Sequence, residues 1–210
     1  MRTTRLIAAA VLLMLALALP LCASAISFSG GHTSISMQDG NRTVTLSGGA
    51  QVETDEVLLK AESVEIYGEN YRYVSCTGNV QAKEKERSIS FRSPSVFFDR
   101  ERKVVSCDSW IEIQDISNQA ALSGAWFEYD MDKSLMKLKM MARILKVTDE
   151  GLMVCRADLI EYDGKKNTVT LKGNATVQYK GDTFRAALIM VDLETDEISL
   201  YGTVSGKFNG

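Results

Sequence analysis

Six segments of the chain alternate between apolar and polar side chains around a central position that is usually small. In the first segment, apolar or small side chains stand at every second position from Val44 to Val52, around Gly48. The six central positions are 48, 78, 109, 140, 173 and 202, which are 30, 31, 31, 33 and 29 residues apart. Successive side chains of a strand point to opposite faces, so this pattern predicts regularly repeated strands with one buried face.

A second series lies between these segments and keeps the same period. Each of its five members has a small residue, an apolar residue three positions later and another two positions after that, as in Ala157, Ile160 and Tyr162. Two series in phase predict repeats of strand, turn and strand that bury a shared apolar face when they stack. In four members an aspartate follows, ten residues before the next central position: Asp99, Asp130, Asp163 and Asp192.

Turn-forming residues stand where the repeat requires them. We therefore predict an all-β fold, elongated and repeat-based, with strand-turn-strand units of about thirty residues, an apolar interior and a charged exterior. The predicted turns are 39–41, 68–70, 99–101, 130–132, 163–165 and 180–182.

The register of the repeats assigns particular side chains to the inner face, which is the candidate site. Cys76 and Cys107 occupy the same slot in consecutive units, so we expect them to be neighbours there. The pattern leaves open whether they form a disulfide or serve as small buried apolar residues like Cys155. The predicted interior ladder is Val44, Leu46, Val52, Val74, Cys76, Val80, Val105, Ile111, Ile113, Leu138, Ile144, Val169, Leu171, Val177 and Leu200.

Residues 134–147 carry two conflicting patterns. Leu135, Leu138 and Leu145 are spaced as on a helix, and the segment is rich in good helix formers. The repeat register instead predicts a strand with Met136, Leu138, Met140, Ala142 and Ile144 inside. We favour the strand, because the repeat is independent of local propensity.

The N-terminus has the pattern of an export signal. Two arginines precede an apolar run, Pro20 ends the run, and Ala23-Ser24-Ala25 fits a signal-peptidase site. We expect residues 1–25 to be cleaved after Ala25, leaving residues 26–210 as one periplasmic domain. Two alternatives are lipidation of Cys22 and an uncleaved anchor, although the run is shorter than a membrane-spanning helix requires.

Charge and chemistry narrow the functional classes. Removing segment 1–25, with its two arginines and no acids, changes the net charge from −3 to −5, and no basic patch predicts binding to nucleic acid. The single histidine, His32, has no partner set for a metal site or a nucleophilic triad. The four repeated aspartates could bind Ca²⁺ or act as acid and base, but we assign them to turn geometry. We therefore expect no enzyme activity, no cofactor and no metal.

The units resemble those of the OstA-like (LptA) family, over roughly residues 43–206. The resemblance rests on segments such as Val44-Thr-Leu-Ser-Gly-Gly-Ala-Gln-Val52 and Cys155-Arg-Ala-Asp-Leu-Ile-Glu-Tyr-Asp163. It implies an open, V-shaped β-jellyroll whose apolar groove carries the acyl chains of lipopolysaccharide or a related glycolipid between membranes. It also implies that edge strands join copies head to tail and bind inner- and outer-membrane partners. The end of the chain at Gly210 favours a stand-alone bridge over a barrel-bearing relative.

Three functions remain open from the residues. A carrier needs an accessible apolar interior, whereas a structural periplasmic scaffold needs the same repeats with a closed one. A polysaccharide-cleaving enzyme is the third, and it requires a catalytic set that the sequence does not present. The candidate edges for partner binding are residues 26–37 and 204–208.

Overall fold

The computed structural model describes residues 25–38 and 41–208. Their regular structure is almost entirely β, with one 3-10 turn, η1 (Glu69–Tyr71). Within these residues no helix has the length and apolarity needed to cross a membrane. The strands are β1 (Ser27–Ser29), β2 (His32–Gln38), β3 (Asn41–Glu53), β4 (Val57–Tyr67), β5 (Tyr73–Glu84), β6 (Ile89–Asp99), β7 (Val104–Cys107), β8 (Ile111–Asp115), β9 (Ala120–Gly124), β10 (Trp126–Asp130), β11 (Leu135–Thr148), β12 (Gly151–Asp163), β13 (Thr168–Tyr179), β14 (Asp182–Asp192), β15 (Ile198–Tyr201) and β16 (Ser205–Lys207).

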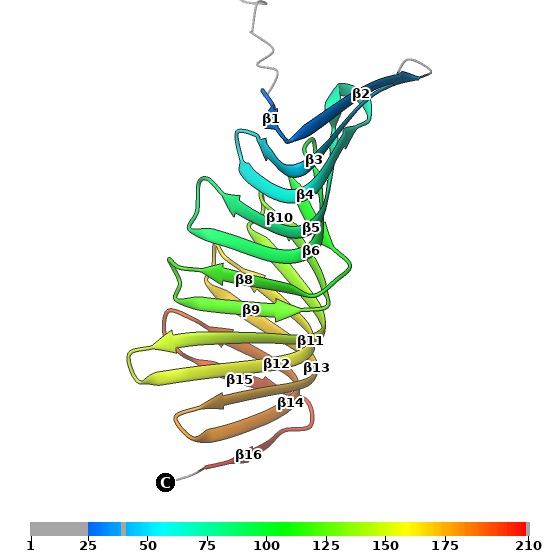
Figure 1. Cartoon of the computed structure of the whole chain (residues 1–210). Coiled ribbons are helices and arrows are strands. Elements are labelled where there is room, and N and C mark those ends of the chain that lie inside the picture. Colours follow the sequence, from blue (N-terminus) through cyan, green and yellow to red (C-terminus); the bar gives the residue numbers. More distant parts are fainter. Residues whose placement is uncertain (1–24, 39–40, 209–210) are drawn as a thin grey trace, which may run out of the picture.

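All pairings are antiparallel, and the strands stack across the long axis of the molecule, from β1 at one end to β16 at the other (Figure 1). The long strands bend near their middle, so the sheet folds over itself into two layers. Layer one contains β1, β8, β9 and β16, and layer two contains β2, β7, β10 and β15. Each remaining strand gives one half to each layer; β6, for example, pairs with β8 through residues 89–92 and with β7 through residues 97–99.

In β3, β5, β11 and β13 the bend contains two consecutive residues in the left-handed region of φ. Gly48 and Gly49 have φ of 74° and 86°, and the register between β3 and β4 shifts beside them. The predicted central positions therefore lie at the corner, which is why small residues recur there. The same conformation is found in Gly78-Asn79, Met140-Met141 and Gly173-Asn174.

Two expectations about the corner are wrong. Met140 lies outside with 57% of its surface exposed, because its φ of 57° places it in the bend rather than on the inner face. The segment centred on Ser109 is two strands, β7 and β8, because residues 108–110 break the pairing at the corner. The predicted turns at 68–70, 99–101, 130–132, 163–165 and 180–182 are confirmed, whereas residues 39–40 of the first predicted turn lie outside the described residues.

The segment 135–148 is a strand, as the repeat register predicts. Met136, Leu138, Ala142 and Ile144 are at most 2% exposed, and β12 pairs along the length of β11. Tertiary pairing thus overrides the helical propensity of the local sequence.

Met141 offers a direct test of the corner. A non-glycine residue in the left-handed region costs roughly 1 kcal/mol, and the Met141 side chain is 73% exposed, so it returns little burial energy. We predict that Met141→Gly raises the free energy of unfolding by about 1 kcal/mol in urea denaturation. Lys137→Gly, on the regular part of the same strand, should lower it by a similar amount. Equal destabilisation by both variants would contradict the assigned corner.

Candidate functional site

The predicted interior ladder forms the core between the two layers. Fourteen of its fifteen members are at most 4% exposed, whereas Leu200 is half-buried because β15 is an edge strand. Side chains of opposite layers meet directly: the ring centroids of Phe91 in layer one and Phe127 in layer two are 5.4 Å apart. The apolar interior is thus continuous along the stack of hairpins.

The ladder omits most of this interior. The second sequence series supplies Val64, Ile66, Val96, Phe98, Phe127, Tyr129, Ile160, Tyr162, Ile189 and Val191, all at most 2% exposed. The series was visible in the sequence, but its side chains were not assigned to the site. Leu59 and Met153 are also fully buried; they stand at alternating positions before Ala61 and Ala157, so the same alternation, followed further along each strand, would have identified them.

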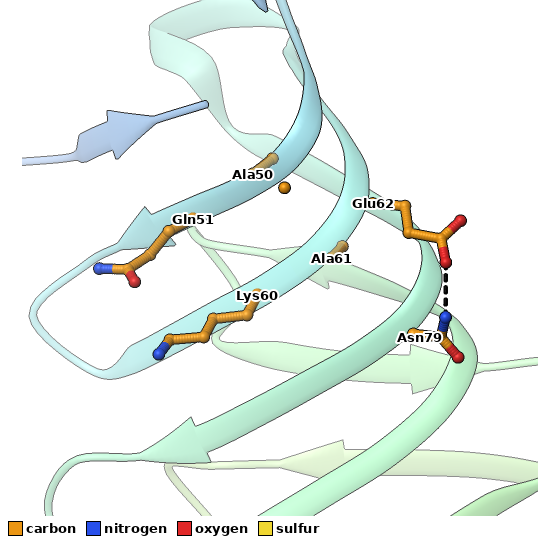
Figure 2. Close-up of a pocket in the computed structure, with 7 residues that line it drawn as sticks. Ala50, Gln51, Lys60, Ala61, Glu62 and Asn79 are labelled. Atoms are coloured by element: carbon orange, nitrogen blue, oxygen red, sulfur yellow. Dashed lines mark hydrogen bonds between the residues drawn. The ribbon is translucent and has the colours of Figure 1, made fainter. Parts of the chain in front are cut away.

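Among the described residues, the apolar side chains of the interior are buried between the two layers and do not line an open groove. Large side chains such as Phe91, Tyr129 and Tyr162 fill the gap between the layers. One hollow, beside Gly49 and Ala61, lies at the corner surface (Figure 2). There Asn79 donates a hydrogen bond to Glu62. In a later repeat, Asn174 donates the equivalent hydrogen bond to Asp158. These contacts hold the bend and do not reach the interior.

Opposite the corner, the two layers meet at an edge that we call the mouth. Side-chain contacts, which we call clasps, join the two layers there. In each clasp named below, the first residue lies in layer one and the second in layer two. Backbone hydrogen bonds between neighbouring turns, such as Lys85 N–H to Glu56 and Met131 N–H to Lys103, run along a single layer. The clasps are Glu56–Lys103 at 3.5 Å, Glu84–Tyr129 at 2.9 Å, Asp115–Tyr162 at 3.0 Å, Lys146 with the Leu193 carbonyl, and Tyr179–Asp196 at 2.9 Å.

Two of the clasps are buried pairs of a tyrosine and a carboxylate. The Tyr129 hydroxyl donates to both oxygens of Glu84, and Tyr162 donates to Asp115, which also accepts two bonds from Asn118. Burial raises the pKa of Glu84, partly opposed by the hydrogen bond from Tyr129. Burial, followed by the charge of the nearby carboxylate, raises the pKa of both tyrosines. Both clasps therefore hold ionisable groups in an unfavourable, poorly solvated position.

The four repeated aspartates serve turn geometry, as predicted. Burial alone would raise the pKa of Asp99, but hydrogen bonds from Arg72 and from the Arg102 backbone bring it below its ordinary value. Within the described residues, no cluster of His, Cys, Asp and Glu side chains could hold a metal ion. Each aspartate accepts a hydrogen bond from the backbone N–H three residues later, in Arg102, Lys133, Lys166 and Thr195.

Cys76, Cys107 and Cys155 are free and buried. Cys76 and Cys107 are not direct neighbours, because β6 lies between β5 and β7 in layer two. Burial raises the pKa of Cys76 and Cys155 to about 12, so their thiols are inert at neutral pH. His32 starts β2 and is exposed.

The fold and its core define a two-layer β-repeat protein with a continuous apolar interior. Residues 32–197 match the family model described as LptA/(LptD N-terminal domain) LPS transport protein, and the chain belongs to this family. A solved structure, LptH, is described as the LptA homologous periplasmic component of the lipopolysaccharide transport device from Pseudomonas aeruginosa. It is 11% identical to this chain, with 89% of this chain and 96% of LptH covered and a TM-score of 0.28. Among curated proteins, the comparison found no match.

The Glu84 clasp generates a pH-dependent prediction. Because the pKa of Glu84 is raised in the folded protein, its charge costs stability above that pKa, and protonation on acidification removes the cost. A glutamine at this position would keep an acceptor for Tyr129 without the charge. We predict that Glu84→Gln has a higher melting temperature than the native protein at pH 7.

The same measurement repeated at lower pH provides the control. The difference in melting temperature should shrink as pH falls toward the ordinary pKa of glutamate and vanish below it. Glu112→Gln, at an exposed position of layer one, should change little at any pH. A Glu84→Gln variant less stable than the native protein at pH 7 would show that the charged form of the clasp is favoured.

Proposed function

We propose that this protein is a periplasmic, non-catalytic carrier that moves lipopolysaccharide or a related glycolipid from the inner toward the outer membrane, with the acyl chains held between its two layers. The family description supports the class of cargo, and the export pattern of residues 1–25 supports the compartment. That N-terminal segment lies outside the described residues, apart from Ala25.

The observation that carries this proposal is the contrast between the corner and the mouth. The corner is continuous backbone, whereas the mouth is joined through side chains such as those of Lys103, Tyr129 and Tyr162. Separating the layers at the mouth therefore bends the molecule about the corner and breaks no strand pairing. An acyl chain then enters between the layers and replaces the contacts that they lose.

The magnitudes favour such an opening. A clasp contributes at most about 1 kcal/mol, and those that bury a carboxylate contribute less, so the five together contribute at most about 5 kcal/mol. Burying an acyl chain of about twelve carbons gains roughly 9 kcal/mol at about 0.8 kcal/mol per methylene. The insertion of one or more chains thus exceeds the loss of the clasps, provided that the tails fill the space between the layers.

The two ends of the stack are suited to strand addition. β1 and β2 form one end and β15 and β16 the other, and each leaves backbone groups facing away from the sheet. Ile35 is 57% exposed at the first end and Phe208 75% at the second. We propose that these edges join copies head to tail and bind the membrane partners of the transport system.

A structural periplasmic scaffold is the second candidate, and the closed interior favours it. A scaffold needs no opening, so its core should exclude lipid under all conditions. The two candidates therefore differ in whether lipid reaches Leu138, which is fully buried between the layers.

Site-specific photo-crosslinking with purified lipopolysaccharide distinguishes them. A photoreactive residue at Leu138 should crosslink to lipid, and one at Lys137, which precedes it on the opposite face of β11, should not. The half-buried Leu200 offers a second interior site whose replacement disturbs the packing less. Crosslinks from the interior sites only to the protein itself, in variants with native circular dichroism, would support the scaffold and refute the carrier.

A further inference from the structure

A polar hollow of about 200 Å³ lies in the mouth, where the turn 85–88 and the turn 115–119 of layer one face layer two. Its lining includes Arg87, Asp115, Asn118, Ser134 and Tyr162. It therefore adjoins the Asp115–Tyr162 clasp and is distinct from the apolar interior described above.

Ser134 is the first sign that this hollow is built for a ligand. The residue is 1% exposed, and its hydroxyl has no hydrogen-bond partner in the protein. A buried polar group left in this state costs roughly 1–3 kcal/mol. Ser134 has a left-handed backbone conformation in its turn, as do Lys103 and Asp196 in the turns of other hairpins. The side chains of Lys103 and Asp196 form clasps, whereas that of Ser134 forms none.

Arg87 is the second sign. It is half-buried, and within residues 25–38 and 41–208 its guanidinium makes no hydrogen bond and no ion pair, although its charge partly opposes the rise that burial causes in the pKa of Glu84 and of the two clasp tyrosines. The guanidinium lies over Gly164, where an added Cβ would be 3.2 Å from its Nη1 atom. The hollow is thus lined by two residues with unused donors, Arg87 and Ser134, beside the buried carboxylate of Asp115.

The charges indicate which ligand these groups suit. Glu84, Glu86 and Asp115 outnumber Arg87 here, so a phosphate would enter a net negative environment. A sugar hydroxyl brings no charge and both donates and accepts, so it can receive bonds from Arg87 and Ser134 and donate one to Asp115.

The floor of the hollow indicates how such a ligand would continue. Ile89 and Met136 line it, and they are 3% and 1% exposed as members of the apolar core. A molecule with a sugar head in the hollow would therefore direct an attached alkyl chain toward the interior.

We propose that the hollow formed by Arg87, Asp115, Asn118 and Ser134 is a head-group site that binds the hydroxyl groups of a sugar ring on an amphiphile. The site rests on the proposed carrier function for the placement of the tail, but the recognition of the sugar is a separate property of these residues.

Binding of three soluble probes to the native protein tests this site. They are a dodecyl glucoside, a dodecyl polyethylene glycol ether with the same tail, and methyl glucoside without a tail. Two to three additional hydrogen bonds should make the dodecyl glucoside bind about five- to tenfold more tightly than the ether, below the critical micelle concentration of both. The glucoside should also shift the backbone amide signals of Asn118, Ser134 and Gly164 in two-dimensional NMR spectra.

Two variants remove the donors. Arg87→Gln and Ser134→Gly should each reduce the preference for the glucoside to about twofold or less and leave the affinity for the ether unchanged. Ser134→Gly also relieves the positive φ of 58°, so the variant should fold at least as stably as the native protein. Arg156→Gln, an exposed position on β12, is the matched control and should keep the full preference.

The outcomes separate this site from the carrier function. Both amphiphiles binding equally to the native protein, or a preference that survives both variants, overturns the sugar site and leaves the carrier intact. Failure of both amphiphiles to bind, with methyl glucoside still shifting the three amides, supports the site and refutes the carrier. Inorganic phosphate shifting the same amides while methyl glucoside does not would replace the sugar site with an anion site.

Discussion

Each hairpin of this protein has an apolar face that it cannot cover alone, and the bend of its strands is what provides the cover. Left-handed pairs such as Gly48-Gly49 and Gly173-Asn174 fold the sheet so that the two halves of a strand face each other. The inner side chains of one layer then bury those of the other, and stacking extends this core along the molecule. The corner, the interior and the mouth all follow from this one requirement.

The mouth is where this arrangement is weakest. The clasps include buried pairs of a tyrosine and a carboxylate and one partly exposed ion pair, and neither kind contributes as much as the apolar core. Under the proposed carrier function, a protein closed by such contacts would be stable without cargo and would open along this one edge at low cost. The polar hollow beside Ser134 lies on that same edge, where the head of an amphiphile would remain when its tail is inside.

Much of the fold could be predicted from the sequence, because the period of the inner side chains is a direct consequence of the strand geometry. The strand at 135–148 and the turn role of Asp99 and its equivalents followed from that period alone. The corner could not be located in the same way, since Met140-Met141 adopts a conformation that its residue types disfavour. The clasps depend on pairs distant in sequence, such as Glu84 and Tyr129, which are 45 residues apart and have no periodic signal. The closed interior was therefore only one of the alternatives that the residues left open, and the hollow has no sequence signal.

Pulsed electron paramagnetic resonance would measure the central claim, that the layers separate at the mouth when lipid binds. Nitroxide labels on cysteines introduced at Glu86 and Lys133 would report on the distance between the two layers, since both residues are exposed in turns on opposite sides of the mouth and the native thiols are buried. Labels at Glu86 and Ser117, both in layer one, would serve as the reference pair. Lipopolysaccharide should lengthen the first distance and leave the second unchanged. An unchanged first distance in protein that demonstrably holds lipid would contradict the account.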